Sequence, residues 1–415
     1  MNEVRFVTKE IGSLAKPGWR VKSIGGRPVE ESDLQEARTW GDRLGVENVE
    51  ELTEILRKGA SFSSSEKAKI QDFAALYGIR LLENAGLDVV YDGEQRRSEM
   101  YDHAVRHAKG FETRGTVRSW DNKYYAKAAV TERPLVDTVY DLEEYEFVRS
   151  HTDRLVKAPF TGAYTIVDWS YDEYYSKDGV LLGAPASRRV EARQRFGMDA
   201  ARDVVRPNIQ GVVEAGAEWV QIDEPAATTR PGEVPLVVET FNATREYIDV
   251  RASMHICFSD YTALFPHIEN LNDCYELQLE FSNRDSLELG RKAEDRPGYD
   301  VLPMFRQSAW GGKIGLGVID IHTDFIEPPE LVCDRILHAS EVLGPERIEV
   351  NTDCGLRTRT WEVSLEKMKN MVEGTRLAEA ALCARQDIGV GERCHVGDDG
   401  GDVPRGGPPG DRRVA

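Results

Sequence analysis

The chain has 415 residues, 40% of them apolar, which is enough to bury a large core. Its 53 basic residues are outnumbered by 72 acidic ones, and the net charge of −19 argues against nucleic acid or anionic membrane as a partner. Residues 1–17 lack the apolar segment of a secretory signal and no 18 apolar residues run together, so we expect a cytoplasmic enzyme.

Eight short apolar runs recur along the chain, and most are followed by a pattern typical of helix. They predict strands at Phe6–Ile11, Leu87–Asp92, Arg154–Pro159, Glu218–Asp223, Ala252–Cys257, Tyr275–Glu280, Ile314–Ile319 and Ile348–Thr352. The predicted helices between and after them include Glu66–Ala85, Ala192–Ala215, Pro235–Tyr247, Pro329–Leu343 and Val363–Cys383. Eight strands that alternate with helices predict an α/β fold, a closed (β/α)8 or TIM barrel.

Three segments depart from this alternation. Residues 14–65 form a long, charged insertion after the first strand and are expected to hold helices of their own. Residues 110–150 follow the second strand, and the runs TVRSW and YYAKAAV around a polar DNK predict a β-hairpin there. Residues 386–415 are rich in Gly, Pro and charge and predict a disordered tail. Residues 1–385 are then expected to form a single catalytic barrel domain.

Metal-ligating side chains stand at the ends of three predicted strands, where barrels build their sites. His255 and Cys257 are two residues apart on an extended strand, so both can face one ion. Glu280 ends the next strand, and Cys354 follows the last one. Two thiolates, an imidazole and a carboxylate suit Zn²⁺. The alternative is that both cysteines are ordinary buried thiols.

The chain resembles the catalytic half of cobalamin-independent methionine synthase over roughly residues 1–385. The motifs that carry the resemblance are IGS at 11–13, DGE at 92–94, QIDEPA at 221–226, HICFSD at 255–260, LEFS at 279–282, DIH at 320–322 and NTDCGLRTRTWE at 351–362. They occur in the family's order and fall at seven of the eight predicted strand ends. QIDEPA and the DCGL segment are more specific to that family than a short H-x-C pattern.

The resemblance implies a role for each matching position. His255, Cys257, Glu280 and Cys354 match the zinc ligands of the family. The residues that match its homocysteine-binding positions are Ile11, Ser13, Glu94 and Asp223. His322 matches its proton-donating histidine, and Trp169 matches a tryptophan near the methyl donor.

The chemistry of these residue types agrees with such a role. A free thiol is only a few per cent thiolate at neutral pH, whereas coordination to Zn²⁺ deprotonates it. Two cysteinates and a glutamate bring three negative charges to the ion, which keeps a bound substrate sulfur reactive. Glu280, the weakest donor of the four, is the ligand expected to yield when the substrate thiol arrives. Glu94 and Asp223 suit an ammonium group, and a histidine can supply a proton to a leaving group.

Each assignment outside the metal set has a structural alternative. Glu94 lies in DGEQRR and could serve only as an ion-pair partner of Arg96 or Arg97. Asp223 precedes a second carboxylate and could cap a helix. His322 could be a structural histidine bonded to Asp320.

The identity of the methyl donor is less well determined, because the sequence departs from the family pattern in three ways. Full-length members carry a second, N-terminal barrel that helps to bind polyglutamated folate, for which 415 residues leave no room. The insertion reads VRSWDNKYYAK at 117–127 and lacks the serine-arginine-cysteine run used near the pterin. Thr229 stands where the family has a carboxylate, which loosens the amino-acid pocket. Short, single-barrel relatives are thought to use a methylcorrinoid or corrinoid protein, so this donor is favoured over methyltetrahydrofolate.

Two other functions remain open. One is a zinc-dependent alkyltransferase that acts on a different thiol, such as coenzyme M, and this enzyme would keep the metal ligands without the amino-acid clamp. The other is a non-catalytic zinc-binding or corrinoid-delivery protein, which would need neither His322 nor a ligand as weak as Glu280. The joint presence of Ser13, Glu94 and Asp223 favours homocysteine.

Overall fold

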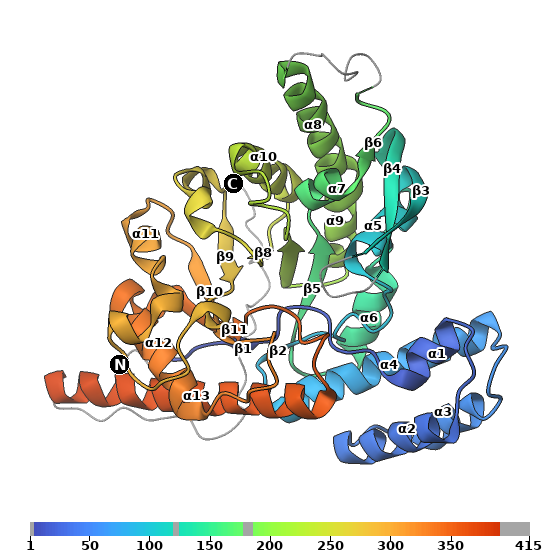
Figure 1. The fold of residues 1–415 in the computed structure, drawn as a ribbon, viewed down its shortest axis with the longest axis horizontal. Coiled ribbons are helices and arrows are strands. Elements are labelled where there is room, and N and C mark those ends of the chain that lie inside the picture. Colours follow the sequence, from blue (N-terminus) through green and yellow to red (C-terminus); the bar gives the residue numbers. More distant parts are fainter. Residues whose placement is uncertain (1–3, 119–123, 177–185, 391–415) are drawn as a thin grey trace, which may run out of the picture.

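The computed structural model describes residues 4–118, 124–176 and 186–390, and its centre is a closed barrel of eight parallel strands (Figure 1). Around the barrel the strand order is β1, β11, β10, β9, β8, β7, β5, β2. Their bounds are β1 Thr8–Lys9, β2 Val89–Val90, β5 Leu155–Thr161, β7 Trp219–Asp223, β8 Arg251–Ile256, β9 Cys274–Leu279, β10 Lys313–Ile319 and β11 Ile348–Thr352. The predicted (β/α)8 barrel and its eight strands are confirmed.

Helices surround the barrel, and their bounds are α4 Ser64–Ala85, α5 Met100–His107, α6 Leu142–Ser150, α7 Ala163–Trp169, α8 Ala186–Ala200, α9 Arg206–Glu214, α10 Val234–Arg245, α11 Leu302–Gln307, α12 Pro329–Leu343 and α13 Trp361–Val390. A π-helical turn at Ala201–Val205 joins α8 to α9. Short 3₁₀ turns occur at Pro231–Glu233, Tyr261–Leu264, His267–Asn270, Ser282–Arg284, Ala293–Asp295, Pro297–Tyr299 and Pro345–Arg347. No described helix combines the length and the apolar character that crossing a membrane requires.

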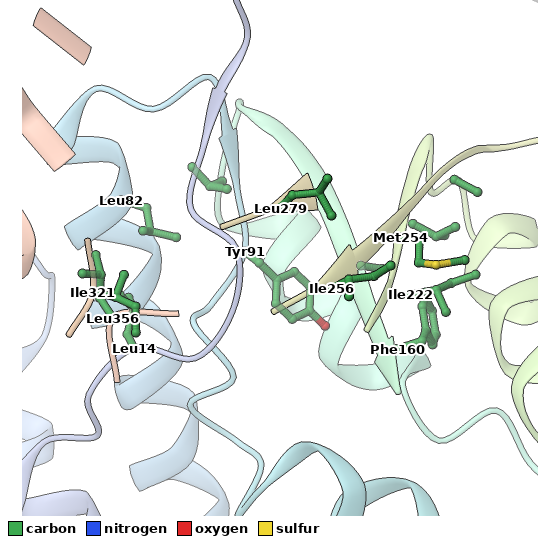
Figure 2. Packing of buried hydrophobic residues seen from close by; sticks show 14 of the residues in the cluster. Leu14, Leu82, Tyr91, Phe160, Ile222, Met254, Ile256, Leu279, Ile321 and Leu356 are labelled. Carbon is green, nitrogen blue, oxygen red and sulfur yellow. The ribbon is translucent and has the colours of Figure 1, made fainter. Parts of the chain in front are cut away.

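Alternating side chains divide each barrel strand between two environments. Ile222, Met254, Ile256 and Leu279 are buried in the hydrophobic core, part of which is drawn in Figure 2. The neighbouring positions point inward and are polar. Lys9, for example, is fully buried and its Nζ lies 2.7 Å from Glu276 and 2.8 Å from Glu349. The inward positions at the carboxyl ends of the strands therefore supply polar groups to the site.

The first insertion contains α1 Gly18–Ile24, α2 Glu31–Leu44 and α3 Val49–Leu56, which lie together beside α4 in Figure 1. Two aromatic contacts attach them to the barrel helices. Trp19 packs edge-on against Tyr77 at 5.5 Å, and Trp40 packs against Trp361 at 5.3 Å. This insertion is thus part of the same core.

The second insertion contains an antiparallel hairpin, β3 Lys109–Arg118 and β4 Tyr124–Leu135, beside α5 in Figure 1. The short strand β6 Tyr171–Asp172 pairs in parallel with β4 and extends the hairpin to three strands. It joins the hairpin to the segment that follows α7. The sequence pattern predicted the hairpin but not this third strand.

The C-terminal boundary differs from the prediction. A tail was expected from residue 386, yet α13 continues to Val390. Adding residues to an existing helix avoids the cost of nucleation, so even polar residues can extend a long helix. Residues 391–415, the rest of the predicted tail, lie outside the described residues.

Candidate metal and substrate site

Three of the four predicted metal ligands meet at the carboxyl end of the barrel. The ligand atoms of His255, Cys257 and Cys354 all lie within 4.8 Å of one another. Nδ1 of His255 lies 3.1 Å from the Gln278 carbonyl oxygen, and since a carbonyl can only accept, Nδ1 carries the proton. His255 Nε2 is then directed at Cys354 Sγ, 3.4 Å away. A backbone carbonyl commonly orients a metal-binding histidine in this way.

The fourth predicted ligand, Glu280, lies beside this cluster but is not part of the three-residue group. Its Oε2 accepts hydrogen bonds from the Phe258 backbone N–H at 2.9 Å and from Asn283 Nδ2 at 3.1 Å. Its Oε1 is buried and has no hydrogen-bond partner among the described residues. That oxygen lies 4.0 Å from Nε2 of His322.

The electrostatics of the cluster favour a cation. A hydrogen bond from Cys257 and the nearby imidazole lower the pKa of Cys354 well below its ordinary value, and the same bond and burial raise that of Cys257. Burial and the Cys354 thiolate raise the pKa of Glu280 to about 8. Although burial opposes it, the same thiolate raises the pKa of His255 to about 9. Cys257, Glu280 and His255 therefore hold protons at neutral pH that a bound divalent ion would displace.

A cavity of about 390 Å³ opens from the cluster, and eight of the ten predicted site residues line it. They are Ile11, Ser13, Glu94, Trp169, Asp223, His255, Cys257 and Cys354. Glu280 and His322 are not among the lining residues. Thr229, at the position that departs from the family pattern, also faces the cavity.

The segment after β1 lies close to the segment after β11. Ser13 donates a hydrogen bond from its hydroxyl to Glu94 Oε2, which brings both side chains to the cavity wall. Gly355 permits this approach, because a Cβ there would lie 2.6 Å from the Ser13 nitrogen. Glu94 itself adopts a left-handed φ of 56°, which is costly for a residue with a side chain.

The two carboxylates on the cavity wall differ in their environment. Burial opposes ionisation of Glu94, but the Arg97 guanidinium and the Ser13 hydroxyl outweigh it and lower its pKa. Burial raises the pKa of Asp223 to about 7. The predicted alternative for Glu94 is therefore present as well, since Arg97 Nη1 lies 3.8 Å from it. Asp223 accepts a hydrogen bond from the Gln221 side chain at 2.7 Å.

His322 lies above Glu280, and its ring packs edge-on against Phe258 at 4.8 Å. Asp320 accepts a hydrogen bond from the backbone N–H of His322 at 2.8 Å. The hydrogen bond to Asp320 that the structural alternative assumed is therefore present, and the backbone of His322 makes it. Burial lowers the pKa of His322 below its ordinary value.

The outer part of the cavity contains residues that the sequence did not single out. Tyr125 and Lys127 of the hairpin line it together with Tyr101 of α5. Arg357 also lines it and donates a hydrogen bond to the Tyr125 hydroxyl. Arg357 follows the DCGL motif and was the easiest of these to find. The segment that contains the hairpin residues was predicted to lie near the methyl donor, but the sequence did not indicate which of its side chains reach the cavity.

Known proteins similar to this chain include a group of archaeal enzymes. The model of the cobalamin-independent synthase catalytic domain matches residues 46–377. The methionine synthase of Thermoplasma volcanium is 37% identical over 327 residues, which cover 74% of this chain and 89% of the relative. That of Thermoplasma acidophilum is 33% identical over 382 residues, which cover 88% of this chain and 96% of the relative.

Solved structures share the fold at lower sequence identity. A B12-independent methionine synthase from Shewanella sp. W3-18-1, solved in complex with selenomethionine, has a TM-score of 0.69 and 19% identity. The match covers 92% of this chain and 99% of that one. A methyltransferase from Methanosarcina mazei has a TM-score of 0.55 and 13% identity, and it covers 89% of this chain and 93% of its own.

Proposed function

The chain belongs to the cobalamin-independent methionine synthase family and is a methyltransferase, and from that premise we propose that it transfers a methyl group to the thiol of L-homocysteine to give methionine, with zinc as cofactor. One observation carries this proposal. A cluster of His255, Cys257 and Cys354 adjoins one cavity with Ser13 and the two carboxylates. Residues that can activate a thiol and residues that can bind an amino acid therefore lie at the same cavity.

The donor set of the cluster fits zinc. His255, Cys257 and Cys354 would hold the ion, and Glu280 would complete the set through its unpaired Oε1. When bound, zinc supplies the positive charge that keeps the substrate sulfur as a thiolate at neutral pH. Burial of the cluster excludes water, which strengthens these electrostatic interactions.

The amino-acid end of homocysteine would occupy the wall of the cavity. Glu94, whose pKa is lowered, stays ionised and suits the ammonium group. Asp223 supplies a second carboxylate nearby. Ser13 and adjacent backbone groups suit the substrate carboxylate. A thiol without an amino-acid group, such as coenzyme M, has no ammonium group to pair with Glu94 and Asp223, and this disfavours it.

For the methyl donor we propose a methylcorrinoid or a corrinoid protein, with methyltetrahydrofolate as the alternative. The support comes from the hairpin, where this chain presents Tyr125 and Lys127 in place of the family's pterin-contacting run. Trp169, 5.9 Å from Tyr101, would contact the donor at this end of the cavity.

His322 is the proposed proton donor. A departing folate nitrogen must gain a proton, whereas a corrinoid leaves with little need for one. The lowered pKa of His322 makes the ring mostly neutral at pH 7. A neutral ring favours a methyl donor, such as a methylcorrinoid, whose leaving group does not need to be protonated.

The decisive test is an assay of the zinc-loaded protein with homocysteine and one of two donors, methylcobalamin or methyltetrahydrofolate. Methionine formed from methylcobalamin alone supports the full proposal. Methionine formed efficiently from the folate would overturn the donor assignment but not the acceptor. Turnover of coenzyme M in place of homocysteine would contradict the acceptor.

A further inference from the structure

The carboxylate of Glu280 has two oxygens in different surroundings. Oε2 is held by the Phe258 N–H and by the Asn283 side chain, whereas Oε1 is buried without a hydrogen-bond partner among the described residues and lies 4.0 Å from Nε2 of His322. The carboxylate lies outside the three-residue group whose ligand atoms are within 4.8 Å. Two donors thus hold the Glu280 carboxyl group beside the cluster.

Asn283 is brought to this place by a rigid loop. Asp353 is fully buried, and its carboxylate accepts hydrogen bonds from the backbone N–H groups of Phe281 at 3.0 Å, Ser282 at 3.1 Å and Asn283 at 2.7 Å. Gly317 makes room for it, because a Cβ at 317 would collide with Asp353 Oδ1. The backbone of the loop is therefore fixed without any help from the Asn283 side chain.

The Asn283 amide itself has no structural task within the described part of the chain. Its Nδ2 donates to Glu280, and its Oδ1 has no partner among the described residues. The second donor, Phe258 N–H, comes from a residue with a left-handed φ of 52°, directly after Cys257. Strained backbone of this kind persists where the surrounding structure requires it, often at a functional site.

We propose that Asn283 is a positioning residue that, together with the Phe258 N–H, holds the Glu280 carboxylate in its displaced position while the homocysteine thiol occupies the metal. This inference rests on the proposed function and extends it to the exchange of ligands. A displaced carboxylate is a buried charge, and each hydrogen bond that it receives stabilises the thiol-bound state. Asn283 thereby favours thiol binding without being a ligand.

The test compares two equilibria in the parent and in Asn283→Ala. The first is metal affinity without substrate, measured by competition with a chelator. The second is homocysteine affinity, measured from the visible spectrum of the cobalt(II)-substituted protein. Loss of a hydrogen bond to a buried carboxylate should weaken homocysteine binding about ten- to a hundredfold. Metal affinity without substrate should stay unchanged or rise, because Asn283→Ala makes the position of Glu280 away from the metal less favourable than it is in the parent.

Further variants separate positioning from folding. Asn283→Asp keeps the shape but places a like charge beside Glu280, so it should weaken thiol binding at least as much. In a Glu280→Ala background, Asn283→Ala should have no further effect on thiol affinity. Asn272→Ala, an exposed asparagine away from the cavity, is the matched control and should match the parent.

Two results would overturn the positioning role. One is metal affinity that falls in parallel with homocysteine affinity, which would mean that Asn283 supports the metal-bound state. The other is unchanged homocysteine affinity in Asn283→Ala. A parent protein whose cobalt spectrum does not respond to homocysteine would instead contradict the proposed function itself.

Discussion

Asp223→Asn is the substitution that most directly tests the proposed binding of the homocysteine ammonium group. Asp223 is 5% exposed, lines the cavity and accepts a hydrogen bond from Gln221 at 2.7 Å. Asparagine has the same shape and can keep the Gln221 contact through its carbonyl oxygen. The change therefore removes a negative charge from the cavity with little effect on packing.

The expected loss follows from the kind of contact removed. A charge-assisted hydrogen bond to the substrate ammonium contributes about 1.5–3 kcal/mol, which corresponds to roughly 10- to 150-fold weaker homocysteine binding. Burial raises the pKa of Asp223 to about 7, so below that pH the parent side chain is protonated and loses the same contact. The ratio of the two dissociation constants should therefore be largest above pH 7 and shrink as the pH falls below it.

Calorimetric titration of the zinc-loaded proteins with homocysteine at pH 6 and pH 8 measures both effects. Asp249→Asn, an exposed aspartate remote from the cavity, is the matched control and should bind as the parent does. Equal affinity of the parent and Asp223→Asn at pH 8 would refute the assigned role. A ratio that does not change with pH would show that the Asp223 carboxylate does not titrate in this range.

Other substitutions test the metal site, the donor and the barrel core. Cys257→Ser and Cys354→Ser should each lose zinc while circular dichroism stays that of the parent, because the ligands sit at strand ends; full zinc occupancy in both would contradict the metal assignment. His322→Ala should reduce methyl transfer from methylcobalamin only modestly, well below the roughly 10²–10⁴-fold loss expected for a general acid. A rate loss of that size would contradict the methylcorrinoid assignment and favour methyltetrahydrofolate as the donor. Lys9→Met should destabilise the barrel by about 3–5 kcal/mol in denaturant unfolding, because it removes the ammonium group that two buried carboxylates share and leaves Glu276 without a cationic partner among the described residues; a loss under 1 kcal/mol would contradict that account.

The sequence determined the barrel and predicted which residues meet at its rim, because both leave local signals. Apolar runs of strand length, such as the one at β10, reflect burial on both faces of the strand and are visible without a structure. The predicted residues His255, Cys257 and Cys354 stand at strand ends, and a closed parallel barrel brings all such ends to one rim. Knowing the fold class was therefore enough to predict that these three side chains lie close together at the carboxyl end of the barrel.

Only the tertiary structure decided the features that depend on distance across the barrel. Glu280 is held beside the cluster of His255, Cys257 and Cys354 by Asn283, a contact that no spacing reveals because it depends on how Asp353 anchors the loop. Tyr125 reaches the cavity from a hairpin far away in sequence. The continuation of α13 to Val390 is likewise set by a helix already nucleated upstream, while composition alone predicted a tail. Sequence patterns record the environment of each residue, whereas the partners of a side chain are fixed only when the barrel closes.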